Sequence, residues 1–250
     1  MADRKRATVF GEAAELYEAA RPSYPMAAID LITSHGPADA VDVGCGTGKA
    51  ARLIADRGIR VTGIEPDERM ASVSRRIGIP VVVTSLEAWT PIPCDLMYAA
   101  QAWHWVDFDI GAALAARAVR PGGRWAALWN DEDDPIYRCH LDAVYGRLAP
   151  QLLEEASSRL THRELTTSIA ASFSATAAFE AMESHEFKWV DQLSVANAVD
   201  RLATYSSHRL LAPRVATTLH AALRDELARL GDPITLGYTT YVLLARRLDP

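Results

Sequence analysis

The feature that most constrains the fold is a short apolar run that leads into three glycines at alternate positions. Residues 40–43 are apolar except for Asp42, and Gly44, Gly46 and Gly48 follow them directly. A helical pattern begins at about Lys49. Glycines at such a turn let the backbone approach a ligand that a Cβ atom would repel, and the helix N-terminus offers free N–H groups. The pattern predicts a strand–turn–helix unit that binds a nucleotide-like ligand.

Short apolar runs alternate with longer helical patterns from about residue 38 to residue 130. This alternation predicts a parallel sheet with helices on both faces. Two later runs add two strands, and the Pro-Gly-Gly sequence at 121–123 predicts a turn before the fifth strand. Strands are expected at residues 40–43, 60–64, 80–83, 96–99, 124–128, 182–190 and 235–245, and helices near 50–56, 68–76, 110–118, 193–205 and 213–230.

The segments that flank the alternating region are expected to form a helical cap. Residues 1–37 contain a helical pattern over 10–20 that Pro22 and Pro25 end, and residues 131–180 are mostly helical. We expect both segments to cover the ligand-binding edge of the sheet. No linker-like stretch separates an independent part, so residues 1–250 are expected to form a single domain.

Composition excludes several classes of function. The chain has 250 residues, of which 49% are hydrophobic and 23% charged, as in an ordinary soluble globular protein. A net charge of −6 argues against nucleic-acid partners, and no long apolar run predicts a membrane span. Cys45, Cys94 and Cys139 form no CxxC pair, which favours a reducing cytoplasm and no metal site. The oligomeric state is not predicted.

An acid at the end of the second expected strand narrows the range of possible ligands. Glu65 is placed to accept hydrogen bonds from a ribose diol. Nicotinamide-dependent oxidoreductases share this plan, but their GxGxxG fingerprint has its third glycine one position later. Asp42, just before the turn, adds negative charge that suits a cationic ligand better than a pyrophosphate. An oxidoreductase is therefore the less favoured alternative.

Five ordered motifs resemble the class I S-adenosylmethionine-dependent methyltransferases. The likeness is greatest to the methyltransferase type 11 group and its trans-aconitate-methyltransferase-like members. The motifs lie at residues 41–48, 63–66, 84–87, 101–105 and 119–123, and the flanking stretches 17–25 and 238–247 also look like this group. The resemblance covers nearly the whole chain. It implies an α/β, Rossmann-like, seven-stranded and mostly parallel sheet, with S-adenosyl-L-methionine as cofactor.

The same resemblance implies a cofactor site. The glycine turn would line the methionine part with Asp42 supporting its amino group, Glu65 would hold the ribose, and Met70 would contact the adenine. Ser85 stands where many relatives have Asp, so its contact with the adenine is expected to be weaker. The residues implied are Asp42, Gly44, Cys45, Gly46, Gly48, Glu65, Pro66, Met70, Ser85, Leu86 (through its backbone N–H), Gln101, Tyr17 and Arg21. For Tyr17 and Arg21 the alternative is that they only dock the N-terminal segment.

Two residues after the fourth expected strand are the catalytic candidates. The resemblance places Gln101 where it would face the transferred methyl group. His104 is either a general base or a histidine that shapes the pocket through hydrogen bonds. Trp103 and Trp105 either face the sulfonium or pack in the interior.

The favoured function is methylation of a small molecule. The methylated atom, O, N or C, is undetermined, and a carboxylate or hydroxyl acceptor is favoured. A binding protein without transferase activity and a methyltransferase acting on RNA or protein are the alternatives, but no basic tract supports the latter. Arg201, His208 and Arg209 either recognise an acidic substrate or, as the favoured interpretation has it, are solvated surface residues.

Overall fold

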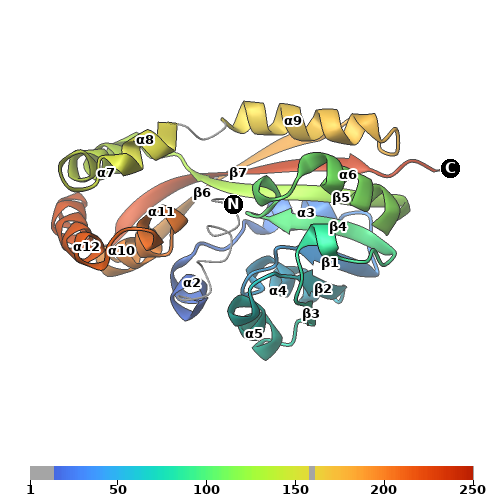
Figure 1. Cartoon of the computed structure of the whole chain (residues 1–250), viewed down its shortest axis with the longest axis horizontal. Helices are drawn as coiled ribbons and strands as arrows, with labels where there is room; N and C mark the ends of the chain where they lie inside the picture. Colours follow the sequence, from blue (N-terminus) through green and yellow to red (C-terminus); the bar gives the residue numbers. More distant parts are fainter. Residues whose placement is uncertain (1–13, 158–160, 250) are drawn as a thin grey trace. The chain divides into compact units, whose positions relative to one another are not determined.

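The computed structural model describes residues 14–157 and 161–249, which divide into two compact units (Figure 1). The sheet unit comprises Ser23–Asn130, Thr161–Phe187 and the described residues from Thr240 onward. The helical unit comprises the described residues of 14–22, 131–160 and Lys188–Thr239. The expected cap segment 131–180 is thus divided between the two units, and the single domain and the position of a cap stay predictions.

A seven-stranded sheet has the order β3-β2-β1-β4-β5-β7-β6. Strands β1 to β5 pair in parallel, whereas β7 runs antiparallel to β5 because Asp133 N–H donates to Gly237 O and Arg247 N–H donates to Gly123 O. The α/β sheet predicted from the sequence is confirmed. The strands are β1 Asp39–Val43, β2 Arg60–Ile64, β3 Val81–Val82, β4 Cys94–Ala100, β5 Val119–Glu132, β6 Glu183–Leu193 and β7 Ile234–Arg246.

The turn predicted before the fifth strand, at residues 121–123, is an irregularity inside β5 instead. These residues lie inside β5, where Gly122 N–H donates to Arg247 O and Arg247 N–H donates to Gly123 O. Gly122 has a φ of 75°, and the pairing of β5 with β4 is irregular between Val119 and Arg124, so the Pro-Gly-Gly sequence interrupts the regular strand inside β5 rather than before it.

Helices cover both faces of the sheet unit. Along β4, Leu96 and Tyr98 pack in one hydrophobic cluster, and Met97 and Ala99 pack in another, as alternation in a strand requires. Helix α9, in the segment expected as cap, contacts α6 instead. The helices of this unit are α3 Met26–Thr33, α4 Lys49–Ala55, α5 Glu68–Arg76, α6 Phe108–Ala118 and α9 His162–Ala175, with short 3₁₀ turns η2 Leu86–Ala88 and η3 Trp103–Trp105.

Side-chain caps begin several of these helices. Asp67 accepts from Arg69 N–H at 2.9 Å before α5, and Asp107 accepts from Asp109 N–H and Ile110 N–H before α6. Thr161 and Glu164 form a reciprocal capping box at α9. The starts of these three helices are thereby fixed by the local sequence.

The helical unit has its own hydrophobic core, built mainly from leucines and tyrosines of α7, α10 and α12. Its helices are α2 Ala14–Ala20, α7 Pro135–Leu148, α8 Gln151–Ser157, α10 Val195–Ala203, α11 Ser206–Arg209 and α12 Pro213–Leu227, followed by η4 Ala228–Leu230. Residues 10–13 of the helix expected over 10–20 lie outside the described residues.

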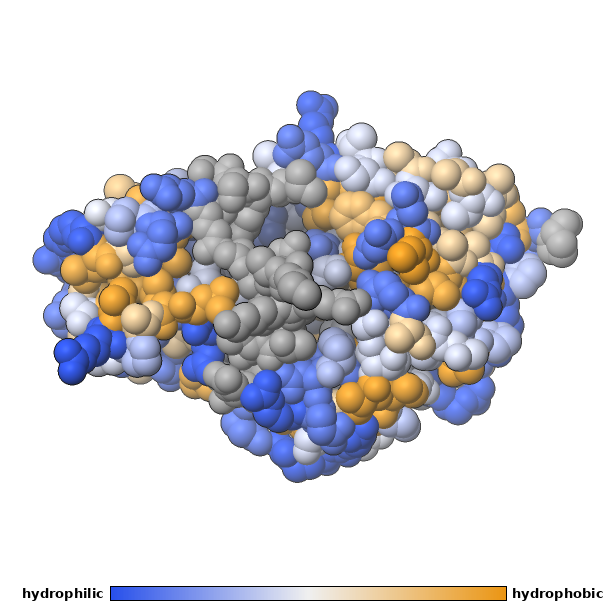
Figure 2. Space-filling view, in the orientation of Figure 1, coloured by the Kyte–Doolittle hydropathy of each residue, from blue (hydrophilic) through white to orange (hydrophobic). Residues whose placement is uncertain are grey.

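The surface alternates hydrophobic and hydrophilic patches within each unit in the view of Figure 2. None of the helices in the described ranges combines the length and apolar character that a bilayer span needs. The most exposed of the large hydrophobic side chains, Val190 and Ile136, lie on different elements.

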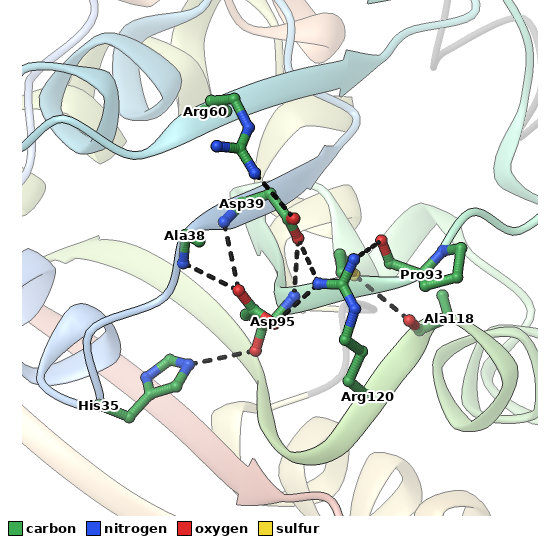
Figure 3. A network of polar contacts seen from close by, with 9 residues as sticks. His35, Ala38, Asp39, Arg60, Pro93, Asp95, Ala118 and Arg120 are labelled. Atoms are coloured by element: carbon green, nitrogen blue, oxygen red, sulfur yellow. Dashed lines mark hydrogen bonds and ion pairs between the residues drawn. The ribbon is translucent and has the colours of Figure 1, made fainter.

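A polar network joins the beginnings of three neighbouring strands (Figure 3). Arg120 Nη1 donates to Asp39 at 2.8 Å and to Asp95 at 2.7 Å, and Asp95 Oδ2 accepts from Ala38 N–H at 2.8 Å. These residues precede or begin β1 and β4 and stand near the start of β5. Parallel α/β sheets bind ligands at the opposite, carboxyl ends of their strands, so this network is structural.

Candidate cofactor and methyl-transfer site

The glycine turn after β1 has the backbone that its sequence predicts. Gly44 and Gly48 have φ values of 66° and 87°, a region that L-residues with side chains rarely adopt. A Cβ on Gly44 would lie 2.6 Å from Ala102 Cβ, and one on Gly48 would lie 2.7 Å from Ser74 Oγ. Only glycine fits at both positions, and the loop after β4, which contains Ala102, lies against the turn.

Glu65 at the end of β2 is buried and holds the turn. Its Oε2 accepts from Gly46 N–H at 2.9 Å and its Oε1 accepts from Asp67 N–H at 2.9 Å. Burial raises the pKa of Glu65 to about 7, although both backbone N–H groups oppose that shift. The acid predicted to bind the ribose therefore lies directly beside the glycine turn.

Asp42, inside β1, is 1% exposed, and neither carboxyl oxygen makes a hydrogen bond of standard geometry with a described residue. Burial raises its pKa well above the usual range, the Tyr98 hydroxyl partly opposes that shift, and the negative charge of Glu65 adds to it. An interior acid whose oxygens lack hydrogen bonds of standard geometry would be stabilised by a cationic ligand at the turn. The residues present thus fit a sulfonium cofactor that carries an ammonium group.

The structure brings the adenine candidates to the same edge of the sheet unit. Met70, on α5, is buried, and its Cε lies 3.4 Å from the position that a Cβ on Gly46 would occupy. Leu86 is buried at the start of η2, directly after Ser85. Pro66, which follows Glu65, is exposed.

Cys45 lies within the turn but is buried, and its thiol occupies the space that a side chain on Gly63 would need. Burial raises the pKa of Cys45 well above its usual value. The thiol is therefore un-ionised and unreactive, and the residue can contribute its backbone and bulk to the site.

Gln101 ends β4 in an unusual conformation. Its φ is 59°, and its backbone N–H donates to Leu128 O at 2.8 Å. The side-chain Nε2 donates to Asn130 O at 2.9 Å, which leaves the Oε1 oxygen as an acceptor. A non-glycine residue in the left-handed region is typical of functional positions that the surrounding structure holds.

Asn130 is a residue that the sequence analysis missed. Its Oδ1 accepts from Thr240 Oγ1 at 2.6 Å, and its Nδ2 donates to Ser23 O at 2.9 Å. The backbone carbonyl of Asn130 therefore holds the Gln101 side chain, and the Asn130 side chain holds the segments of Ser23 and Thr240. The available signal was a polar residue directly after the apolar end of the fifth expected strand.

His104 lies in η3, just after Gln101, and its Nδ1 accepts a hydrogen bond from Trp129 Nε1 at 3.2 Å. An indole nitrogen only donates, so Nδ1 carries the lone pair and Nε2 the proton of the neutral ring. To act as a general base, His104 would first have to release the hydrogen bond from Trp129. The geometry favours the pocket-shaping role over the base role for His104.

The neighbouring tryptophan at position 103 packs in the interior. Trp103 is fully buried, 4.8 Å from the Trp125 ring in an edge-on contact and 6.0 Å from the Phe173 ring. Its aromatic face belongs to the core of the sheet unit. The packing alternative therefore holds for Trp103.

Tyr17 and Arg21 belong to the helical unit. Arg21 Nε donates to Thr204 Oγ1 at 2.7 Å, and its guanidinium lies 5.0 Å from the Tyr17 ring and 4.3 Å from the Tyr205 ring. These contacts dock the N-terminal segment on the end of α10. A cofactor contact of Tyr17 or Arg21 stays a prediction.

The interpretation of Arg201 and His208 as solvated surface residues is wrong. Arg201 is 5% exposed and donates to Asp191 at 2.6 Å and to Tyr238 Oη at 2.7 Å. His208 is 3% exposed and lies 3.0 Å from Tyr145 Oη. Amphipathic α10 turns Arg201 inward, where these partners compensate its charge.

Comparison with known proteins gives one family. Residues 41–127 match the family described as methyltransferase domain. An uncharacterized methyltransferase of Mycobacterium tuberculosis is 31% identical over 203 residues, which are 79% of this chain and 76% of that protein. The chain belongs to the methyltransferase family. It is an S-adenosylmethionine-dependent enzyme, so the predicted cofactor and enzyme class are confirmed and the oxidoreductase alternative is rejected.

Other proteins match over a smaller part of the chain or are similar mainly in their fold. The trans-aconitate 2-methyltransferase of Acidovorax sp. is 31% identical over 133 residues, 49% of this chain and 52% of that protein. A solved structure from Anaeromyxobacter dehalogenans, provisionally named a type II methyltransferase, has a TM-score of 0.62 and 26% identity and covers 92% of this chain and 99% of its own. Phosphoethanolamine N-methyltransferase 2 of Haemonchus contortus shares the fold, with a TM-score of 0.56 and 15% identity over 96% of this chain and 58% of its own.

Proposed function

We propose that this methyltransferase acts on a small molecule and that the acceptor is a carboxylate or hydroxyl oxygen. The observation that carries the proposal is the engagement of His104 Nδ1 by Trp129, which leaves that ring without a free lone pair for a general base. A carboxylate acceptor needs no base because it is already ionised, so this observation favours a carboxylate over a hydroxyl, which must lose a proton. The likeness to trans-aconitate 2-methyltransferases supports the same choice of acceptor.

We infer the cofactor contacts from the geometry of the turn. Glu65 would accept the ribose hydroxyls, Asp42 would stabilise the ammonium group from behind the turn, and Met70 and Leu86 would contact the adenine. Gln101 would place its Oε1 oxygen toward the transferring methyl. When bound, the cofactor supplies an electrophilic methyl group on a sulfonium. The task of the protein is to hold the acceptor in line with it and to exclude water.

Product detection tests the proposal. The purified enzyme is incubated with methyl-labelled cofactor and, in separate reactions, a panel of small carboxylic acids, a panel of small hydroxyl compounds, a panel of small amines and carbon acids, bulk RNA and a protein extract. We expect label and S-adenosylhomocysteine to appear with the carboxylic acids or the hydroxyl compounds. Label transfer only to RNA or protein would contradict a small-molecule substrate, and transfer only to amines or carbon would contradict the proposed acceptor.

A further inference from the structure

Two side chains just after β4 are held by consecutive residues at the end of β5. Gln101 Nε2 donates to the backbone carbonyl of Asn130 at 2.9 Å, and His104 Nδ1 accepts from Trp129 Nε1 at 3.2 Å. All four residues belong to the sheet unit. The loop after β4 is therefore tied to β5 at the carboxyl ends of the strands, where open α/β sheets bind ligands.

The indole of Trp129 is held in place by the core of the sheet unit. Trp129 is 4% exposed and packs in the same hydrophobic cluster as Trp125 and Ala127, on one face of β5. Its ring lies 5.9 Å from the ring of His162, on α9, in an edge-on contact. The His162 ring in turn stacks on Tyr241, on β7, at 3.8 Å. Close packing of these rings fixes the direction in which the Trp129 N–H points.

The hydrogen bond from Trp129 determines which atom of His104 is a donor. An indole nitrogen only donates, so Nδ1 of His104 holds a lone pair and the proton of the neutral ring is on Nε2. His104 is an exposed residue, so its ring is accessible to a ligand. His104 therefore offers an N–H donor in an orientation that Trp129 sets.

A carboxylate is the acceptor group that such a donor fits. One carboxylate oxygen can accept from Nε2 while the other oxygen forms the new bond to the methyl carbon. The carboxylate supplies the electron pair of that bond, and the electrons of the broken carbon–sulfur bond stay on sulfur, so no proton leaves and no base is needed. Hydrogen bonds to an ionised acceptor are also stronger than those to a neutral one.

We propose that His104 recognises the carboxylate of the methyl acceptor by donating from Nε2, and that Trp129 positions His104 for this contact. The proposal rests on the proposed small-molecule function and narrows the acceptor from an oxygen atom in general to a carboxylic acid. In this account His104 touches the substrate, whereas Trp129 acts only through His104.

Two amide substitutions separate donation from the other roles of His104. The amide of His104→Gln reaches about as far as Nε2 and keeps a donor there. The amide of His104→Asn reaches only about as far as Nδ1, so it keeps an acceptor for Trp129 but loses the donor. Neither amide can act as a general base, because neither takes up a proton near neutral pH.

Benzoate and hexanoate, each compared with its primary amide, are the probes. Each acid and its amide share one body and differ in the charge of the accepting group, and ligand-observed NMR measures their binding to the full chain with S-adenosylhomocysteine present. We expect the wild type to bind at least one acid several-fold more tightly than its amide. His104→Gln should keep that preference, and His104→Asn should weaken binding of the acid by about tenfold. General damage to the site would weaken acid and amide alike.

Trp129→Phe tests the positioning role. The change removes the N–H that orients His104 and should reduce the preference for the acid by about threefold, while the affinity for S-adenosylhomocysteine changes little. Trp125→Phe is the matched control, because it makes the same change in the same cluster, where the indole nitrogen has no hydrogen bond to a described residue. Trp125→Phe should leave the preference unchanged, and equal effects of the two variants would remove the positioning role from Trp129.

Equal results in His104→Gln and His104→Asn would overturn the proposal, whether both variants keep the preference for the acid or both lose it. Loss of methylation in both variants with unchanged binding of the acid would identify a general base instead. Binding of neither acid by the wild type, or tighter binding of the amides, would also overturn the proposal if S-adenosylhomocysteine binds. If S-adenosylhomocysteine itself fails to bind, or label passes only to amines, carbon, RNA or protein, the proposed function fails instead.

Discussion

At the scale of single residues, the site depends on groups that only one residue type can supply. Gly44 touches Ala102 so closely that no side chain fits, and the buried Glu65 accepts hydrogen bonds from Gly46 N–H and Asp67 N–H. Asp42 is buried, and neither of its carboxyl oxygens makes a hydrogen bond of standard geometry with a described residue. Each of these features costs stability by itself, which is typical of functional positions.

The acid at position 65 predicts a pH dependence of cofactor binding. A protonated Glu65 cannot accept two hydrogen bonds from a diol, so affinity should rise with pH through about 7, the pKa of this carboxyl in the folded protein. Below that pKa the affinity for S-adenosylhomocysteine should fall by roughly tenfold per pH unit. Calorimetric titration between pH 5.5 and about 8.5 measures this dependence.

Glu65→Gln is the control for that dependence. The variant should bind S-adenosylhomocysteine at least about tenfold more weakly at pH 8, a loss of ~1.4 kcal/mol, and its affinity should vary less with pH. Because folding raises the pKa of Glu65 above its usual 4.5, the folded state also loses stability as pH rises from 4.5 to 7. An unchanged affinity in Glu65→Gln would remove the ribose role from this residue.

Gly44→Ala tests the close approach of the turn. The added methyl meets Ala102 at 2.6 Å, and φ of 66° adds backbone strain. We expect a loss of about 2–4 kcal/mol in the free energy of unfolding, measured by urea denaturation. Gly58→Ala is the matched control, since Gly58 has φ of 82° but nothing within 4 Å, and should lose only ~1 kcal/mol. Equal losses in the two variants would refute the contact.

At the scale of elements, the carboxyl ends of β4 and β5 are joined by side chains. Gln101 donates to the backbone of Asn130, and Asn130 in turn binds Thr240 and Ser23. Ser23, Asn130 and Thr240 are the residues at which the chain enters or leaves the sheet unit. One amide side chain therefore fixes three chain segments at the edge where the predicted acceptor site lies.

Asn130→Ala should impair turnover more than cofactor binding. The change removes hydrogen bonds to Ser23 and Thr240, at a cost of about 1–3 kcal/mol in stability, and loosens the backbone that positions Gln101. We expect kcat to fall at least about tenfold, ~1.4 kcal/mol in the barrier, while the affinity for S-adenosylhomocysteine changes little. Equal kcat in the variant and the wild type would contradict a positioning role.

At the scale of the whole molecule, the sequence predicted the parts that local pattern determines. The bounds predicted for β2, residues 60–64, agree with the structure because an apolar run and an acidic end define them. The division of residues 131–180 was not predictable, because both α7 and α9 show only a local helical pattern, and the packing of α9 against α6 is a long-range contact. Likewise, nothing local shows that Arg201 is buried, since its partners Asp191 and Tyr238 come from two other strands.

The helical unit should lose stability in acid. Burial lowers the pKa of His208 to about 3, so this ring stays neutral in the folded protein at pH values where the unfolded chain takes up a proton. Stability should therefore fall as pH drops from 6.5 toward 3, by up to ~1.4 kcal/mol per pH unit from this group. Urea denaturation at pH 7 and pH 5 measures the effect. His208→Gln should lose less stability over that interval, and an equal loss would exclude His208 as the cause.

The most direct test of the central claim is calorimetric titration of the wild-type chain with S-adenosylmethionine and, separately, with NADH. We predict one-to-one binding of S-adenosylmethionine, no binding of NADH, and much weaker S-adenosylmethionine binding by Glu65→Gln. No heat of binding at millimolar S-adenosylmethionine, or equal affinity in the wild type and Glu65→Gln, would contradict the account of the glycine turn and its acid.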